Sequence, residues 1–173
     1  MLPILADQVL MILDACTLIN LVNGEVLALV LGLPDDEFLV SPMVRDESSS
    51  IAQAVDHAVQ SGRLGYVDDE IISATEFAQA KREMRLGNGE TECILAAEKL
   101  GCHIACDDHQ ARLRATERLH DAGRVTGSIG LLRRLCGANL MAPEQALAAY
   151  NLMRSRGGYL PALGLEDFAG NYA

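Results

Sequence analysis

The stretch Val9-Leu10-Met11-Ile12-Leu13-Asp14 gives the first indication of the fold. Its five apolar residues form a short continuous run, which is typical of a strand covered on both faces. The run ends at an acid. The same pattern returns at residues 103–106, where a second apolar strand is followed by Asp107 and Asp108. Shorter strands are expected at residues 37–40, 65–67 and 124–126.

Helices are expected between these strands. Ser41-Pro42 is a helix start, because a hydroxyl side chain at the N-cap is followed by proline at the first helical position. Strands that alternate with helices predict an α/β fold, in which a parallel sheet carries helices on both faces. The expected helices span residues 15–33 (with a candidate break at Asn23-Gly24), 42–60, 68–85, 90–100, 109–120, 128–136 and 143–156.

The length and composition predict one cytoplasmic domain. A chain of 173 residues suits a single domain, and its core must be aliphatic, because 50% of the residues are hydrophobic but only 4% are aromatic. Five cysteines, an odd number without framework spacing, indicate a reducing compartment without disulfides. The first residues lack the basic region of a secretory signal, and no stretch reaches the roughly 20 apolar residues of a membrane span.

The net charge of −10, from 14 basic and 24 acidic residues, argues against nucleic-acid binding. Affinity for phosphate groups comes mainly from Lys and Arg. This objection weakens if several carboxylates converge on bound cations, because the charge of the ions then belongs to the site. The positions of the acids are therefore informative.

Asp14, Asp107 and Asp108 each come at the end of an apolar strand. In parallel sheets, ligands bind beyond the carboxyl ends of the strands, at the switch point in strand order. Taken alone, Asp14 also fits a helix cap or a turn, and an N-cap accounts for one of the other two. Their shared position predicts that they meet at one edge of the sheet.

Glu47 is expected on the buried side of its helix, because it lies three residues after Val44 and four before Ile51. A carboxylate there must be paired or metal-bound. Glu90 and Glu92 open a later helix, where the dipole favours acids but explains one better than two. Clustered carboxylates repel one another unless they bind hard cations, so the acids predict a Mg²⁺ or Mn²⁺ site suited to attack of water on a phosphodiester.

Five further patterns follow one another along the chain. They are LDACTLINL (13–21), SPMVRDE (41–47), GETECILA (89–96), ACDDHQAR (105–112) and VTGSIGLL (125–132). In this order they resemble the motifs of PIN domains. The resemblance runs from about residue 9 to residue 140, and it departs from the usual family pattern at Cys16 and Cys106.

The resemblance implies a PIN-like three-layer sandwich with a central parallel sheet of four or five strands. Residues 1–142 would form the nuclease domain, and residues 143–173 a helix and loose tail packed on it. It also implies a Mg²⁺- or Mn²⁺-dependent endoribonuclease, the toxin of a prokaryotic toxin–antitoxin pair. The implied catalytic acids are Asp14, Glu47, Glu92 and Asp108, and the implied metal ligands are Asp14, Glu47, Glu90, Glu92, Asp107 and Asp108.

Which member of two pairs binds the metal directly stays open. The helical stripe favours Glu90 facing inward, whereas the family pattern favours Glu92, and Asp107 and Asp108 are adjacent. Thr17 is a candidate partner for a carboxylate or a metal-bound water. Arg112 follows the Asp pair closely enough to fix a carboxylate or a scissile phosphate.

The expected substrate is RNA. An antitoxin protein and a second copy of the chain are the candidate protein partners, and no membrane is involved. Basic residues at helix surfaces are often only solvated, but two clusters are candidates for binding RNA phosphates. The candidates are Lys81, Arg82 and Arg85 and, on a later helix, Arg112, Arg114 and Arg118.

Other interpretations fit less well. Cys102, His103 and Cys106 invite a zinc site, but strand alternation puts the histidine on the opposite face from the cysteines, and no second pair completes a tetrahedral set. A phosphatase of the haloacid-dehalogenase type would need a second Asp where Cys16 stands. The serious alternative is a catalytically weak PIN module that mainly binds a partner protein, which the net charge favours and the intact acids oppose.

Overall fold

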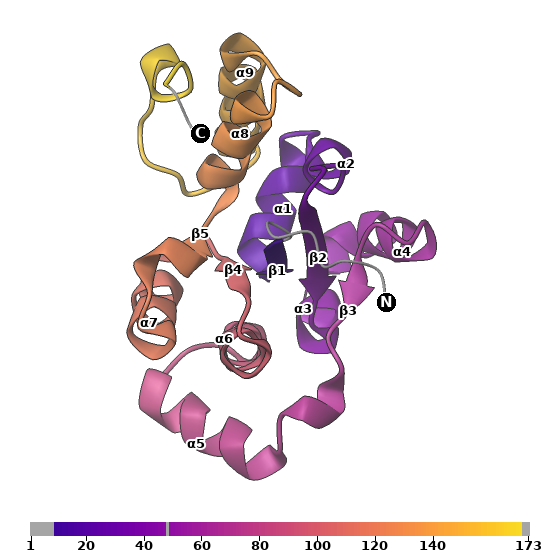
Figure 1. The fold of residues 1–173 in the computed structure, drawn as a ribbon, viewed down its shortest axis with the longest axis vertical. Helices are drawn as coiled ribbons and strands as arrows, with labels where there is room; N and C mark the ends of the chain where they lie inside the picture. Colours follow the sequence, from indigo (N-terminus) through magenta and orange to yellow (C-terminus); the bar gives the residue numbers. More distant parts are fainter. Residues whose placement is uncertain (1–8, 48, 171–173) are drawn as a thin grey trace.

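The computed structural model describes residues 9–47 and 49–170. Its centre is a sheet of five parallel strands in the order β3-β2-β1-β4-β5 (Figure 1). The predicted α/β fold with a central parallel sheet is confirmed. The strands are β1 (Val9–Leu13), β2 (Asp36–Val40), β3 (Gly65–Tyr66), β4 (His103–Ala105) and β5 (Val125–Thr126).

Helices lie on both faces of this sheet. Figure 1 shows α1, α2, α8 and α9 on one side and α5, α6 and α7 on the other. No helix in the described part of the chain is long and apolar enough to cross a membrane. The helices are α1 (Ala15–Asn23), α2 (Leu27–Val30), α3 (Pro42–Glu47), α4 (Ala52–Gln60), α5 (Ala74–Met84), α6 (Asn88–Leu100), α7 (His109–Leu119), α8 (Ser128–Gly137) and α9 (Pro143–Ser155).

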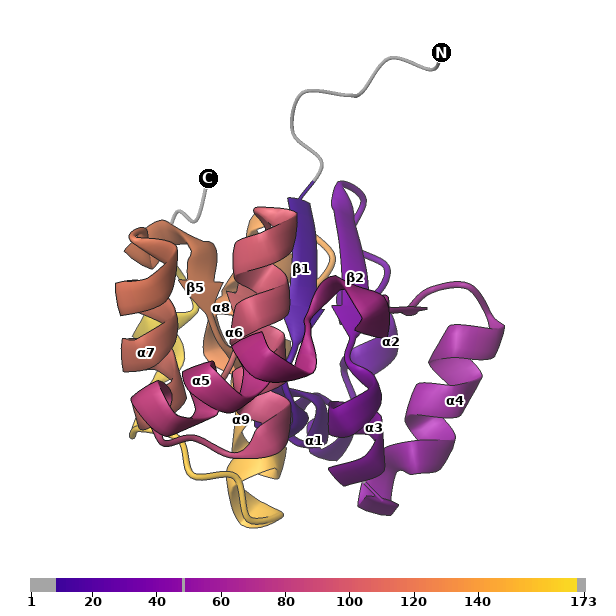
Figure 2. The same ribbon diagram turned by 90° about the horizontal axis from the view of Figure 1, so that it is seen from below.

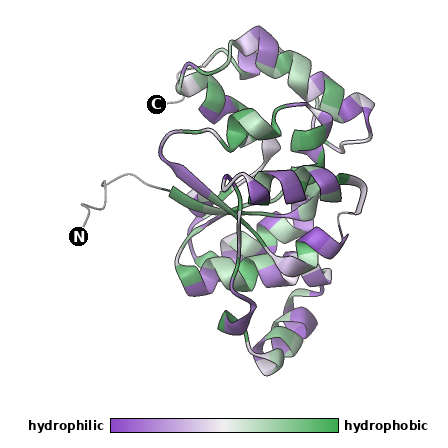
Figure 3. Ribbon diagram, turned by 90° about the vertical axis from the view of Figure 1, so that its right-hand side faces the viewer, coloured by the Kyte–Doolittle hydropathy of each residue, from purple (hydrophilic) through white to green (hydrophobic). Residues whose placement is uncertain are grey.

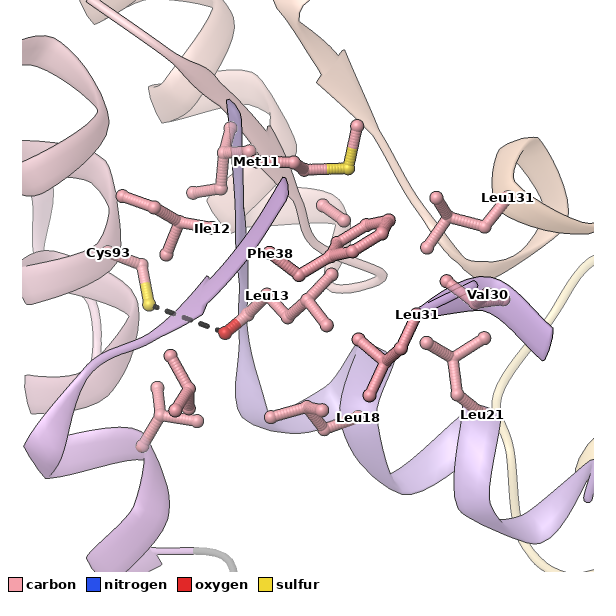
Figure 4. Packing of buried hydrophobic residues seen from close by; sticks show 14 of the residues in the cluster. Met11, Ile12, Leu13, Leu18, Leu21, Val30, Leu31, Phe38, Cys93 and Leu131 are labelled. Atoms are coloured by element: carbon pink, nitrogen blue, oxygen red, sulfur yellow. Dashed lines mark hydrogen bonds between the residues drawn. The ribbon is translucent and has the colours of Figure 1, made fainter. Parts of the chain in front are cut away.

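The core is aliphatic and centred on β1, whose last three residues are fully buried because helices cover both faces of the sheet. Figure 3 shows this strand as a hydrophobic element in the interior. On one face, Leu18, Leu21, Val30 and Leu131 gather around Phe38 (Figure 4). On the other, α6 is buried at every residue from 91 to 97, as expected for a helix enclosed by its neighbours.

The predicted continuous helix over residues 42–60 is wrong. α3 ends at Glu47, and a 3₁₀ turn at Ser49–Ile51 precedes α4. Serine side chains compete with the helix for backbone hydrogen bonds, so a serine-rich stretch interrupts a helix that apolar periodicity alone would continue. The break matters because the expected burial of Glu47 rested on the continuous helix.

The predicted helix over residues 68–85 is also wrong at its start. Only a 3₁₀ turn forms at Asp69–Ile71, and α5 begins after Ser73, whose side chain and that of Glu76 form a capping box. The candidate break at Asn23-Gly24 is confirmed, because α1 ends at Asn23.

Residues 157–170, which follow α9, are anchored to the domain and are not loose. Phe168 is fully buried, and its ring lies 5.9 Å from that of Tyr150. The backbone N–H of Leu163 donates to the Tyr150 hydroxyl oxygen at 3.0 Å, and that hydroxyl donates to the carbonyl oxygen of Pro161. The tail has little regular structure, so its anchoring is a tertiary effect.

Candidate active site

The carboxyl ends of the central strands meet at one edge of the sheet. Leu13 at the end of β1 is in register with Val40 of β2 and with Ala105 of β4. The backbone N–H of Asp14 continues this contact by donating to the Ala105 carbonyl at 3.0 Å. The chain leaves β1 toward β2 on one side while β4 lies on the other, so Asp14 stands at the switch point where such folds bind ligands.

Asp14 is the N-cap of α1, and its buried carboxylate keeps one oxygen available to bind a further group. Its side chain is 1% exposed, and Oδ1 accepts a hydrogen bond of 2.7 Å from the Thr17 backbone N–H. Within the described residues, Oδ2 and the buried Thr17 hydroxyl have no hydrogen-bond partner. Burial, helped by the charges of Asp107 and Glu90, raises the pKa of Asp14 to about 7 against the opposing effect of the Thr17 backbone and side chain.

Asp107 is held by three hydrogen bonds from two other elements. Its Oδ2 accepts from Asn20 Nδ2 of α1 and from the Ser128 hydroxyl, both at 2.7 Å. Its Oδ1 accepts from the Ser128 backbone N–H at 2.8 Å, at the first turn of α8. This carboxylate is therefore fixed in place beside the switch point.

Asn20 and Ser128 are site residues that reasoning from the sequence missed. Both are buried. Asn20 lies three residues after Thr17, so the two polar side chains share a face of a mainly apolar helix. That pairing is a signal that periodicity would have given.

The neighbours of Gly127 leave no room for a side chain at this position. A Cβ at this position would lie 2.9 Å from Arg112 Nη1 and closer still to Asp107 Oδ1. Gly127→Ala is therefore expected to displace Asp107 and lower the free energy of unfolding by about 1–3 kcal/mol, measured by urea denaturation.

Gly32→Ala is the matched control, since a Cβ there meets nothing nearer than 3.4 Å. Equal stability of the two variants would show that Asp107 and Arg112 move aside without cost.

Asp108 has a different role from its neighbour. It is the N-cap of α7, and its Oδ1 accepts from the Ala111 backbone N–H at 2.9 Å. Arg112, which was predicted to fix a carboxylate or a phosphate, donates from Nη1 to the backbone carbonyl of Cys106 at 3.1 Å. It thereby braces the loop that carries both acids.

Glu90 and Glu92 also have separate partners. Glu90 Oε2 accepts from the Gly87 N–H at 2.9 Å in the first turn of α6. Glu92 is only 7% exposed, and its Oε2 accepts from the Met43 N–H at 3.2 Å, at the start of α3. The apolar stripe of this helix predicted that Glu90 faces inward, but Glu92 is the more buried of the two acids. The reason is that α6 is enclosed on nearly all sides and has no single apolar stripe.

The predicted burial of Glu47 is wrong, since Glu47 is exposed. It is the last residue of α3, and the helix that would have carried it into the core does not continue. Its Oε1 accepts from the Gly89 N–H at 3.1 Å, so it caps the start of α6. The positive end of that helix favours the negative charge.

Three of the predicted cationic residues lie around the junction of α5 and α6. Lys81, Arg82 and Arg85 are all exposed. The Lys81 ammonium donates to Asn88 Oδ1 in the first turn of α6. Arg85 ends α5 in the left-handed conformation with φ 58°. This arrangement puts positive charge next to the helix that bears Glu90 and Glu92.

Four of the acids act on one group, the Cys16 thiol. Burial raises the pKa of this thiol to about 12, and the charges of Asp14, Glu90, Asp107 and Asp108 all contribute in the same direction. Two of them, Asp107 and Glu90, also raise the pKa of Asp14. Carboxylates from the ends of β1 and β4 and from the start of α6 are therefore within electrostatic range of one thiol.

The residues fit a hard divalent cation bound by few protein ligands. Among residues 9–47 and 49–170, no three His, Cys, Asp or Glu side chains are arranged as a complete metal-binding group. Mg²⁺ often needs no such group, because it keeps several waters and takes one or two carboxylates. The unpartnered Asp14 Oδ2 and the nearby Asp107 supply oxygen ligands of that kind.

A comparison with protein families identifies the family of the chain. A family model described as DUF3368: PIN domain matches residues 10–168. The chain belongs to the PIN domain family. PIN domains are typically nucleases and generally use divalent metal ions. A comparison with curated proteins and another with solved structures found no match.

Proposed function

We propose that this PIN domain is a Mg²⁺- or Mn²⁺-dependent endoribonuclease. The observation that carries the proposal is the buried Asp14 carboxylate, which has one oxygen without a hydrogen-bond partner among the described residues and whose pKa is raised by the charges of Asp107 and Glu90 as well as by burial. So much negative charge in one place is costly unless a cation neutralises it. Oxygen ligands select hard ions, and the phosphodiester of RNA is a substrate that such ions serve.

Each residue has a role in the proposed chemistry. Asp14 and Asp107 would hold the ion, which supplies an activated water and charge stabilisation when bound. Asn20 and Ser128 keep Asp107 in one orientation through their hydrogen bonds. The exposed cations of α5 would bind phosphates of the RNA chain, and this would offset the acidic surface locally. These cations are Lys81, Arg82 and Arg85.

The biological setting that we propose is a toxin–antitoxin pair. In that setting the partners are the RNA substrate, an antitoxin protein, and a second copy of the chain in a homodimer. The proposal rests on the resemblance of the five motifs to those of one PIN subgroup.

Metal dependence tests the proposed function directly. Cleavage of single-stranded RNA is expected with Mg²⁺ or Mn²⁺ and is expected to stop when EDTA removes the ion, because the acids then repel both one another and the RNA. Calorimetry should show Mn²⁺ binding in the micromolar to millimolar range.

Asp121→Asn is the matched control, since Asp121 is an exposed acid on a separate turn, and both metal binding and cleavage should be unchanged. A wild-type protein that neither binds Mn²⁺ nor cleaves RNA would instead be a module that mainly binds a partner protein.

A further inference from the structure

The segment after α9 passes directly beside the carboxylate site. The chain turns at Gly157, where φ is 102°, and the Gly158 N–H donates to the Met153 carbonyl at 2.8 Å. A Cβ at Gly158 would lie 2.6 Å from Asn20 Oδ1, so only glycine allows this close approach. The amide of Asn20 is the group that holds Asp107. The side-chain amide of Asn20 therefore lies between Gly158 and the Asp107 carboxylate.

Figure 2 shows the same placement at the level of the fold. The C-terminal end of α9 and the segment that follows it lie at the same end of the molecule as α1 and α3. This end contains the carboxyl edge of the sheet, from which Asp14 leaves β1.

Tyr159, the next residue, holds its ring in solvent. The side chain is 102% exposed, whereas Phe38, Tyr150 and Phe168 are buried. Hydrogen bonds fix the backbone on both sides of Tyr159. Before it, the Gly158 N–H donates to the Met153 carbonyl. After it, Pro161 and Leu163 are hydrogen-bonded to the Tyr150 hydroxyl. An aromatic ring that the fold leaves in water on an anchored segment is a ready contact surface.

We propose that Tyr159 stacks on a base of single-stranded RNA bound at the carboxylate site. The proposal rests on the ribonuclease function proposed above. One exposed ring is enough for a base, because every base has a flat π-face. A helical peptide in a groove needs several apolar anchors side by side, and the neighbours Leu160 and Leu163 are partly buried against the core instead.

Stacking on one exposed ring suits a single strand better than a duplex. Bases within an A-form helix are stacked on one another, and proteins reach them mainly in loops and single-stranded regions where they can be splayed out. Tyr159 follows Gly158, and only Asn20 separates Gly158 from Asp107, so a base next to the scissile phosphate is within reach of the ring. Tyr159 is thus a substrate-binding residue and takes no part in the chemical step.

The test compares Tyr159→Ala with Tyr159→Phe, which keeps the ring. The probe is a fluorescein-labelled single-stranded oligonucleotide with 2′-O-methyl sugars. Its binding to the protein in the presence of Mg²⁺ is measured by fluorescence anisotropy. Tyr159→Ala should bind roughly 5- to 150-fold more weakly, and Tyr159→Phe should stay within about twofold of wild type. In cleavage of unmodified RNA, KM should rise in Tyr159→Ala without a change in kcat, because a remote contact contributes uniform binding.

Leu165→Ala is the matched control, because Leu165 is exposed on the same anchored tail. Wild-type affinity and KM in Tyr159→Ala would overturn the stacking role while leaving the ribonuclease proposal intact. If the wild-type protein binds the oligonucleotide but cleaves no RNA, the result contradicts the proposed ribonuclease function and not the binding role of Tyr159.

Discussion

The substitution Asp14→Asn is expected to abolish RNA cleavage and, at the same time, to stabilise the metal-free protein at neutral pH. Asp14 is 1% exposed, and one of its oxygens has no hydrogen-bond partner within the described residues. Cleavage should fall on the order of 10³-fold, because the substitution removes the central charge of the proposed site. Such a trade of stability for activity is common at functional sites.

The sign of the stability effect follows from the pKa of Asp14, which burial raises from 3.8 to about 7. Between these values the unfolded chain loses the proton while the folded protein keeps it. The free energy of unfolding therefore falls as pH rises through this window, and the stabilisation by the neutral acid is lost above about pH 7. Asp14→Asn removes this dependence.

The net gain above neutral pH should be roughly 1–3 kcal/mol, because relief of the buried charge exceeds the cost of an unsatisfied amide N–H. Urea denaturation in EDTA at about pH 5 and about pH 8 measures it. Asp121→Asn should show neither effect, because Asp121 is exposed. An Asp14→Asn variant that is less stable than wild type at the higher pH would contradict the prediction.

Asp107→Asn and Asp108→Asn are expected to differ sharply, although the two residues are adjacent. At position 107, the new amide N–H₂ would face the donors of Asn20 and Ser128. Cleavage should fall on the order of 10³-fold, and the free energy of unfolding by about 1–3 kcal/mol. At position 108 asparagine is itself a good N-cap for α7, so stability should change by less than about 0.5 kcal/mol.

The decisive measurement is kcat/KM for RNA in both variants, together with urea denaturation. Cleavage by Asp108→Asn should stay within about tenfold of wild type, since Asp108 contributes to the field without being bound to Asn20 and Ser128. Equal loss of cleavage in the two variants would make Asp108 a direct metal ligand.

The sequence was sufficient for features that depend on neighbouring residues. The apolar run of β1 and the acid that follows it are visible in the first 14 residues, and β4 repeats the pattern before Asp107. Alternation of strands and helices then fixes a parallel sheet, whose geometry brings the ends of β1 and β4 to one edge. The proximity of Asp14 to Asp107 could therefore be predicted from the sequence alone.

Other features depended on contacts between residues far apart in the sequence. Asn20 and Asp107 are separated by 87 positions, and no local pattern pairs them. Glu47 was misplaced because helical periodicity does not detect the break at Ser49–Ile51. The choice between Glu90 and Glu92 stayed open because the packing around α6, and not its own stripe, decides which acid is covered.

The sequence by itself thus determined the sheet, the order of its elements and the acids at its carboxyl edge, since these follow from local hydrophobic patterns and from strand geometry. Only the tertiary structure decided which partner each acid has, and that the tail is anchored so that Gly158, the residue before the exposed Tyr159, lies beside Asn20. The physical reason is that hydrogen-bond partners and burial are set by which distant segments pack together, and a one-dimensional pattern does not contain that information.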